Sequence, residues 1–360
     1  MERRECLLWL NSIGVNHRQM KNLDQYFPVL SDVLNGNTED LKRCGIRSQK
    51  IQSQITRKDM ESFEHYKKEM TKLGIDFMTY DDAYFPDHLK DIPDPPLILY
   101  YMGDRHCLNR NSIGMVGARK ATPVGRHIAR DLGRDLAKNQ YVVVSGMAYG
   151  IDTEAHRGAV ESKGLTVAIL GCGLDQNYPS HNRSLKKDLL SLGGAIVSEF
   201  PVGTAPLARN FPQRNRIISG LSKGVIVVEA GLKSGSLITV DYALEQNRDV
   251  FSVPGSVLSS VSEGTNQLIK DGAVPITEAK DVLHYYGLEE ECNEENTKSF
   301  DHLSEIEKKV CLWIMKHQPI HPDEIHLGTR IPMSDLLPVL TILEIKNEVE
   351  KLNNRFILQK

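Results

Sequence analysis

Residues 225–246, VIVVEAGLKSGSLITVDYALEQ, decide the fold class of this 360-residue chain. The β-branched run from Val225 to Val228 indicates a buried strand of a parallel sheet, and SLITVDYALEQ indicates a helix. The turn between them, residues 231–236, carries a lysine, two serines and two glycines. Because a helix N-terminus offers free backbone N–H groups, this turn predicts an anion site. Its spacing matches neither the P-loop nor the dinucleotide-binding fingerprint.

The same strand–helix alternation extends over residues 111–284. Apolar segments alternate there with amphipathic ones such as PVGRHIARDLGRDLAKN; the apolar segments are NSIGMVGA, YVVVSG, LTVAILG, AIVSEF, GVIVVEA and DVFSVPG. Repeated βαβ units predict an α/β fold with a Rossmann-like, doubly wound, mainly parallel sheet. We assign residues 76–287 to this domain, including a proline-rich, extended lead-in over residues 76–110.

The segment before the sheet, residues 1–75, contains only helical patterns and polar breaks and predicts a small all-helical domain of the SAM or helix-hairpin-helix kind. The hexapeptide LKRCGI (41–46) is similar to a helix-hairpin-helix, whose backbone N–H groups can contact phosphate. A plain helical packing domain is the simpler interpretation, because a glycine in a helix–helix turn is common.

The segment after the sheet divides into a linker and a third domain. Residues 288–300 are acidic and lack an apolar period, which predicts a solvated linker. Residues 301–360 show three helical patterns and a short final strand, the order of a winged helix. The candidate recognition helix, residues 333–352, has few basic residues and a broad apolar face, which favours protein contact over groove reading.

The composition limits the class of protein. A net charge of −3 and a pI near 6.5 mean that any polyanion site must be a local basic patch. The six cysteines lack C-x-x-C spacing, which argues against zinc and disulfides and suits a reducing compartment. The N-terminal apolar run is too short for a signal peptide and no segment has the length of a membrane span, so we expect a cytoplasmic protein.

Four loops at predicted strand ends carry the chemistry, because ligands of an open parallel sheet lie beyond the carboxyl ends of its strands. These loops are GARKATPVG (117–125), SGMAYGID (145–152), ARNFPQRNRIISG (208–220) and AGLKSGS (230–236). They are expected to form a cationic rim, defined by Arg119, Lys120, Arg209, Arg214, Arg216 and Lys233. With little acid among them, these cations would repel one another unless a polyanion fills the site.

The residues of these loops give little support for an enzymatic function. A dinucleotide-dependent enzyme needs an acid about twenty residues after the first glycine turn, but residues 137–139 are Ala-Lys-Asn. No Ser-His-Asp elbow, H-E-x-x-H motif or paired metal carboxylates occur. The remaining candidates for a general base near strand ends are Asp152, His156, Asp175 and Glu199. Structural roles are equally open: Asp152 can cap a helix, His156 can bond to Asp152, and Glu199 can bind Arg216.

Single-stranded nucleic acid fits the rim better, since it needs a cationic groove and planes on which bases stack. Arg119, Lys233 and the backbone N–H groups at 145–146 and 235–236 are the expected phosphate contacts. Phe211, Asn215 and Arg216 are the expected base contacts.

Several long motifs resemble the DprA/Smf family of bacterial DNA-processing proteins over residues 75–285. They are GARKAT, SGMAYGIDTEAH, AILGCGLDQNYPSHN, SEFP, NFPQRNRIISGLS, VVEAGLKSGSLITVDYALEQNRDVFSVPG and EGTNQLI. The resemblance implies a protein without enzymatic activity or cofactor that binds and protects incoming single-stranded DNA during natural transformation. It also implies loading of the RecA recombinase, dimerisation through the Rossmann-like domain, and contact with single-strand-binding protein or other competence proteins. The predicted contact set is Arg119, Lys120, Ser145, Gly146, Phe211, Arg214, Asn215, Arg216, Lys233, Ser234, Gly235 and Ser236.

Two other functions remain open. A nucleotide-processing enzyme similar to the lysine-decarboxylase-like phosphoribohydrolases would carry P-G-G-x-G-T-x-x-E at the matching turn. This chain has EAGLKSGSLIT, with Lys233 in place of a glycine and Thr239 and Val240 where the catalytic acid belongs. A pure interaction scaffold, whose basic loops pair internally, would show no salt-dependent binding of nucleic acid.

Overall fold

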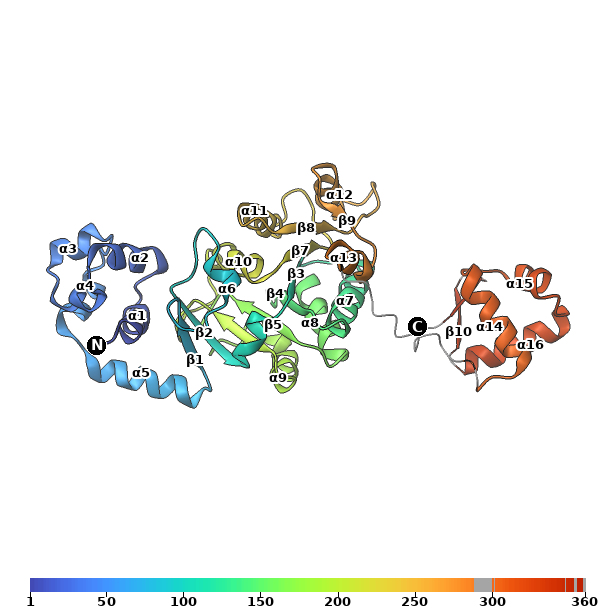
Figure 1. Cartoon of the computed structure of the whole chain (residues 1–360), viewed down its shortest axis with the longest axis horizontal. Helices are drawn as coiled ribbons and strands as arrows, with labels where there is room; N and C mark the ends of the chain where they lie inside the picture. The colour runs from blue at the N-terminus through green and yellow to red at the C-terminus, as the bar shows by residue number, and fades with distance from the viewer. Residues whose placement is uncertain (288–299, 301, 347, 353–354, 359–360) are drawn as a thin grey trace. The chain divides into compact units, whose positions relative to one another are not determined.

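The computed structural model describes residues 1–287, 300, 302–346, 348–352 and 355–358. The chain forms two compact units, Met1–Tyr286 and Gly287–Lys360, which are described separately (Figure 1). The predicted acidic linker lies outside the described residues except for Phe300, whose side chain is buried in the core of the second unit. That unit therefore includes a residue that the sequence pattern assigned to the linker.

The first unit is built on a nine-stranded sheet, counted over the described residues, in the order β1-β2-β6-β5-β4-β3-β7-β8-β9. The strands from β6 to β9 in this order pair in parallel, whereas β1 and β2 are antiparallel additions at one edge. This confirms the mainly parallel, Rossmann-like sheet. The strand bounds are β1 Asp76–Thr79, β2 Ile98–Gly103, β3 Ser112–Val116, β4 Val142–Ser145, β5 Thr166–Leu170, β6 Ala195–Ser198, β7 Gly224–Val227, β8 Asp249–Ser252 and β9 Val274–Pro275.

The sheet reverses its direction of growth at β3. From β3 the chain adds β4, β5 and β6 on one side, and then returns to place β7 on the other side of β3. In doubly wound sheets the ligand crevice lies at this switch point, outside the carboxyl ends of the strands. The loops that leave β3 and β7 are the ones that contain Arg119 and Lys233. The topology therefore brings together two of the predicted loops that are distant in sequence.

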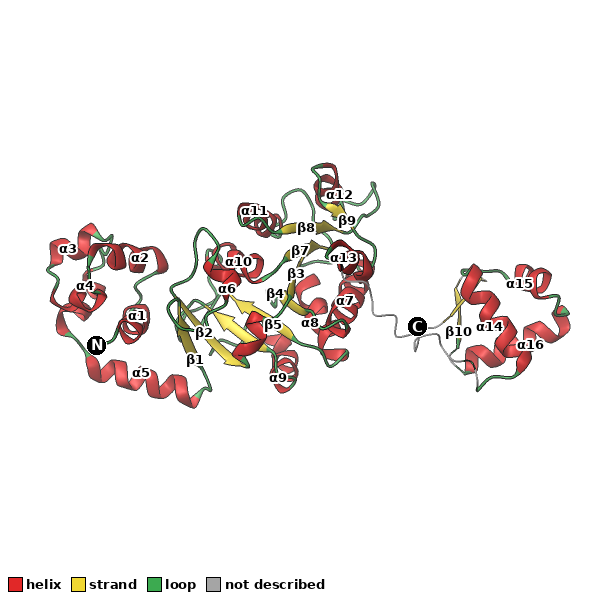
Figure 2. Ribbon diagram, viewed as in Figure 1, coloured by secondary structure: helices red, strands yellow, loops and turns green. Residues whose placement is uncertain are grey.

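Helices cover both faces of the sheet (Figure 2). One face packs α7, α8, α9 and α13, and the other packs α6, α10 and α11. Successive residues of β7 alternate between these faces, with Val225 and Val227 in one cluster and Ile226 in the other. Such two-sided burial explains the continuous apolar run that identified the strand. The helix bounds are α6 Asp87–Lys90, α7 Pro123–Lys138, α8 Ile151–Glu161, α9 Arg183–Ser191, α10 Asn210–Leu221, α11 Leu237–Glu245, α12 Glu263–Lys270 and α13 Ala279–Tyr285, with 3-10 turns Arg105–Asn109 and Ser180–Asn182.

The N-terminal region is helical, as predicted. Its elements are α1 Arg3–Ser12, α2 His17–Tyr26, the 3-10 turn Leu30–Asn35, α3 Thr38–Arg43, α4 Gln49–Arg57 and α5 Met60–Lys72. The helices pack on the sheet through one continuous hydrophobic cluster, and the hydroxyl of the fully buried Tyr100 donates to Asn11 at 2.7 Å. The expected boundary at residue 75 therefore marks the change from helices to the strands of the sheet. It does not divide the chain into two separately packed domains. Helices α3 and α4 meet at Gly45, which has φ +86° and forms the hairpin suggested by LKRCGI.

The second unit consists of α14 Glu305–His317, α15 Pro322–Thr329, α16 Met333–Ile345, β10 Val349–Leu352 and β11 Arg355–Leu358. The two strands form an antiparallel hairpin, and Ile320 adds a bridge to Phe356. This is the element order expected for a winged helix. Within the described chain, no helix combines the length and the apolar character that a membrane span requires.

Candidate nucleic-acid interface

A cavity of about 460 Å³ opens at the switch point of the sheet. The loop after β3, the segment after β4, helix α10 and the start of α11 form its walls. Of the predicted contact set, it is lined by Arg119, Phe211, Arg214, Asn215, Ser234, Gly235 and Ser236. Three of the four predicted loops thus supply contact residues to one cavity, and the loop after β4 contributes Ala148 and Asp152 instead.

Arg119 and Phe211 form a cation and aromatic pair at the cavity wall. The guanidinium carbon of Arg119 lies 5.4 Å from the centre of the Phe211 ring, within the range of a cation–π contact. Arg119 is exposed, and within the described residues it makes no hydrogen bond or ion pair. Phe211 is partly buried, and a side chain at Gly171 would collide with its ring. The arrangement leaves one guanidinium group free beside an aromatic ring.

The turn from Gly231 to Ser236 presents an uncapped helix N-terminus to the cavity. Ser236 precedes α11, and its side chain makes no capping hydrogen bond. The hydroxyl oxygens of Ser234 and Ser236 lie 2.7 Å apart. The Thr239 hydroxyl is buried, lines the cavity and has no partner among the described residues. The N–H groups of Leu237 and Thr239 already donate to the carbonyls of Ser234 and Ser236, at 3.1 and 3.0 Å. The unpartnered Thr239 hydroxyl and the positive end of the helix dipole favour a bound anion.

Glu229, at the end of β7, holds the Arg119 loop in place. Its carboxylate accepts hydrogen bonds from the backbone N–H of Thr122, at 2.9 Å, and from the Thr122 hydroxyl. Its backbone carbonyl accepts from the N–H of Ala118 at 2.7 Å. The sequence interpretation missed this acid, although its place directly before the turn was a usable signal. Because the Glu229 carboxylate is hydrogen-bonded to this loop, its repulsion of a bound anion is reduced.

Lys120 and Lys233 are exposed on the two loops but do not line the cavity. Among the described residues neither forms a hydrogen bond or ion pair. They are therefore available at the edge of the cavity, where a flexible cation can follow a phosphate backbone.

Arg214 lies in the cavity wall but is not a free cation. Its side chain donates to the carbonyl oxygens of Gly146, at 2.9 Å, and of Ile169. Burial lowers the pKa of Arg214 to about 10, and the charge of nearby Asp152 opposes that shift. The guanidinium links the loop after β4 to β5, so Arg214 supports the scaffold, and its predicted contact with DNA stays a prediction.

Ser145 and Gly146 also serve the scaffold. The Ser145 side chain is fully buried and donates to the carbonyl of Met115 at 2.6 Å. The N–H of Gly146 donates to the carboxylate of Asp152 at 3.2 Å. Because these donors already have partners, the predicted role of this pair as a phosphate cradle does not fit the geometry.

Arg216 points away from the cavity. Its guanidinium forms a two-bond pair with the Glu199 carboxylate, with N–O distances of 2.9 and 2.7 Å, and a further bond to Asp94. The side chains of Arg216 and Glu199 are only 3% and 4% exposed. The predicted Glu199–Arg216 pair is present, but the predicted contact of Arg216 with a base is wrong.

The error has a single cause. The sequence interpretation placed residues 208–220 in a loop, whereas α10 begins at Asn210. Consecutive helical residues are rotated by roughly 100°, so Arg214, Asn215 and Arg216 face three directions. Asn215 lines the cavity and is not buried, and its Oδ1 accepts a hydrogen bond from the Nε of Arg214 at 3.3 Å. The cationic rim of six residues is therefore reduced to Arg119, Lys120 and Lys233 at this cavity.

His156 lies behind the cavity wall, and its buried imidazole makes the free energy of unfolding depend on pH. It is fully buried, its Nδ1 lies 2.7 Å from the hydroxyl of Thr166 rather than bonding to Asp152, and burial lowers its pKa to about 3. Below the unfolded pKa of about 6.5 the unfolded chain takes up a proton that the folded chain does not. We expect the free energy of unfolding to fall by about 2 kcal/mol on this account between pH 7 and pH 5.

Urea denaturation at the two pH values checks this expectation, with His156→Leu as the control. The variant removes the titrating group, so its pH dependence should be shallower by that amount. Equal dependence in both proteins would contradict a neutral, buried imidazole.

Within the described residues, no cluster of His, Cys, Asp or Glu has the arrangement of a metal site. Asp152 accepts N–H groups of its own loop, and Asp175 accepts the N–H of Gly203 at 2.9 Å. Both carboxylates therefore make structural contacts with backbone N–H groups, and Asp152 also lines the cavity.

Residues 76–287 match the family model described as DNA recombination-mediator protein A. The protein Smf of Escherichia coli K12 is 45% identical over 203 residues, which are 56% of this chain and 54% of that protein. The match thus spans about half the length of that relative.

Two solved structures are also similar. The X-ray structure of DNA processing protein A from Streptococcus pneumoniae has a TM-score of 0.68 and 34% identity, covering 79% of this chain and 98% of its own. The structure of DNA processing protein A from Helicobacter pylori, which concerns the single-stranded DNA binding mode of that protein, has a TM-score of 0.53 and 31% identity. It covers 58% of this chain and 95% of its own.

Proposed function

Because the chain belongs to the DNA recombination-mediator protein A family, which is the DprA/Smf family that its motifs resemble, we propose that the cavity at the switch point binds single-stranded DNA. The proposed phosphate contacts are Arg119, Lys120, Lys233 and the turn formed by Ser234, Gly235 and Ser236. Phe211 and Asn215 are the proposed base contacts. Arg214, Arg216, Ser145 and Gly146 hold the scaffold.

One observation carries this proposal. Arg119 combines a free guanidinium, an aromatic neighbour and an opposing uncapped helix N-terminus at the switch point of the sheet. Phosphates need the cation and the N–H groups, and bases need the ring; neither requires a sequence code. The internal pairing expected of a pure scaffold holds for Arg214 and Arg216. Among the described residues it does not hold for the other four cations of the rim, which are Arg119, Lys120, Arg209 and Lys233.

Fluorescence anisotropy of labelled oligothymidine and of a matched duplex, measured over a range of salt concentrations, tests the proposal. We expect tighter binding of the single strand and an affinity that falls steeply with salt, since phosphate contacts release counterions. Equal affinity for both DNAs, or an affinity independent of salt, would contradict it.

We further propose that the bound strand is protected and handed to RecA during natural transformation, in the cytoplasm and without any enzymatic step. Earlier onset of RecA filament formation on DNA coated with single-strand-binding protein would support loading. Dimerisation through the sheet-containing unit and protein contact through the C-terminal unit stay predictions.

The phosphoribohydrolase-like alternative needs its catalytic acid at the position in the cavity wall where this chain has Thr239. Incubation with nucleoside monophosphates should therefore release no free base. Release of base, lost on changing a cavity residue, would favour the enzyme.

The substitution Gly235→Ala should weaken DNA binding without lowering the stability of the protein. An added Cβ meets no atom within 4 Å, and the residue does not have positive φ. We expect unchanged or slightly greater stability, by up to about 1 kcal/mol, because alanine restricts the unfolded chain. In the occupied site the same methyl would obstruct close approach of a phosphate to the backbone. Anisotropy should show an affinity lowered about three- to tenfold; wild-type affinity would place the phosphate elsewhere.

A further inference from the structure

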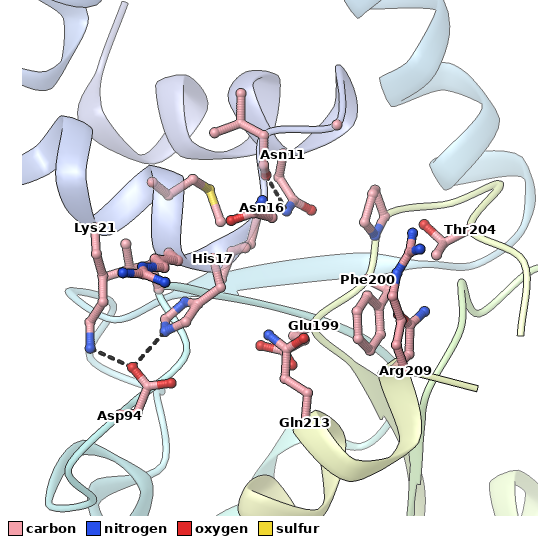
Figure 3. A pocket seen from close by; sticks show the side chains of 18 of the residues that line it. Asn11, Asn16, His17, Lys21, Asp94, Glu199, Phe200, Thr204, Arg209 and Gln213 are labelled. Carbon is pink, nitrogen blue, oxygen red and sulfur yellow. Dashed lines mark hydrogen bonds and ion pairs between the residues drawn. The ribbon is translucent and has the colours of Figure 1, made fainter. Parts of the chain in front are cut away.

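A second cavity, of about 810 Å³, lies between the N-terminal helices and the sheet-containing part of the same unit (Figure 3). Residues 11–21 form one wall, and residues 199–213 form the other together with Asp94. Helix α10 contributes to both cavities through different faces: Asn210 and Gln213 line the second, whereas Phe211 and Asn215 line the first. The segment Ala208–Arg209 separates the two cavities, with one residue lining each.

The acids of the second cavity already have partners. Asp94 accepts from Lys21 at 2.6 Å and from His17 at 2.9 Å, contacts drawn as dashed lines in Figure 3. Burial alone would raise the pKa of Asp94, but these hydrogen bonds and the nearby Arg216 hold it well below its usual range. Glu199 is engaged with Arg216. Both carboxylates therefore have cationic partners within the protein.

Two cations of the second cavity remain free. Arg18 and Arg209 are exposed, and among the described residues neither has a hydrogen bond or ion pair. They come from opposite walls, Arg18 from α2 and Arg209 from the residue before α10. Positive charge is therefore in excess across the cavity, which favours the binding of an anion there.

The wall formed by residues 199–213 also carries groups that suit a nucleic-acid base. The ring of Phe200 is partly exposed, and Figure 3 shows Phe200, Thr204 and Arg209 on the side of the cavity away from Asp94. Within the described residues, the Thr204 hydroxyl and the Gln213 side-chain amide have no hydrogen-bond partner. An aromatic plane beside free amide and hydroxyl groups can stack a base and bond to its edge.

We propose that the second cavity is a further subsite for the same DNA strand, with a phosphate between Arg18 and Arg209 and a base on Phe200. This rests on the proposed function, because the strand reaches the subsite from the first cavity. A helix with its side chains is about 10–12 Å wide, a distance that a few nucleotides span across the Ala208–Arg209 segment. The N-terminal helices then contact DNA directly and lengthen the site, which the sheet alone would limit.

Anisotropy with two oligothymidines tests the subsite in the full chain. One should be about 5 and the other about 20 nucleotides long, bracketing common single-domain site sizes of about 4–16 nucleotides. We expect Arg18→Ala and Arg209→Ala each to lower affinity for the long oligonucleotide about three- to tenfold, to leave the short one unchanged, and to reduce the salt slope by about one. Arg57→Ala is the matched control, since Arg57 is an exposed arginine of the same helical region that lines neither cavity.

The Arg119→Ala variant in the same assay separates the two proposals. If it weakens both oligonucleotides while Arg18→Ala behaves like Arg57→Ala, the subsite is overturned and the first cavity stands. If Arg119→Ala changes neither, the proposed function itself fails. Because Arg18 and Arg209 lie on separate elements and have no partners to lose, an effect shared by both reports on the cavity rather than on folding.

Discussion

Arg216→Ala should lower the free energy of unfolding by about 3–5 kcal/mol, the range for breaking a buried ion pair by removing one partner. The substitution leaves the Glu199 carboxylate, 4% exposed, without its two-bond partner, and it removes a hydrogen bond to the Asp94 backbone carbonyl. Urea denaturation monitored by circular dichroism measures the loss.

Arg209→Ala is the matched control for this prediction. It removes the same side chain from the start of the same helix, but from an exposed position without partners, so we expect a change within about 0.5 kcal/mol. A double variant, Arg216→Met with Glu199→Leu, should recover part of the loss because no unpaired charge then remains. A stable Arg216→Ala protein with weakened DNA binding would instead restore the original interpretation of Arg216 as a DNA contact.

Arg119→Ala should weaken binding of oligothymidine about tenfold to a hundredfold and reduce its salt slope by about one. The change removes the free guanidinium that faces the cavity and its contact with Phe211. Stability should hardly change, since the side chain is exposed and has no hydrogen-bond partner among the described residues. Anisotropy over a salt series gives both quantities.

Arg126→Ala provides the comparison for Arg119, because it is an exposed arginine on α7 that lines neither cavity. It should reduce the affinity by less than about twofold, a purely long-range effect that salt screens. Equal losses from the two variants would mean that net charge, and not this cavity, governs binding.

The parallel sheet was predictable because its strands are buried on both faces, which leaves runs such as Val225–Val228 without polar residues. That the loops after β3 and β7 meet at one edge of the sheet was predictable, since ligands of doubly wound sheets bind at the ends of the strands. The antiparallel pair β1–β2 was not recognised, because the proline-rich segment before β2 masks a short edge strand.

The site was only partly predictable, because sequence order does not reveal which way a side chain points. Arg214, Asn215 and Arg216 are consecutive and polar, yet the helix sends two of them to buried partners. The acidic partners of Arg216, Glu199 and Asp94, lie 17 and 122 residues away in sequence. The role of Glu229 in fixing the Arg119 loop likewise depends on a contact across 107 residues.

The most direct test of the central claim is ultraviolet cross-linking of oligothymidine to the full chain, followed by mass spectrometry of the cross-linked peptides. We expect the main cross-link at Phe211, the aromatic side chain of the first cavity, and its loss in the Arg119→Ala protein. Cross-links confined to the C-terminal unit, or a Phe211 cross-link that persists undiminished without Arg119, would contradict single-stranded DNA binding at the switch point of the sheet.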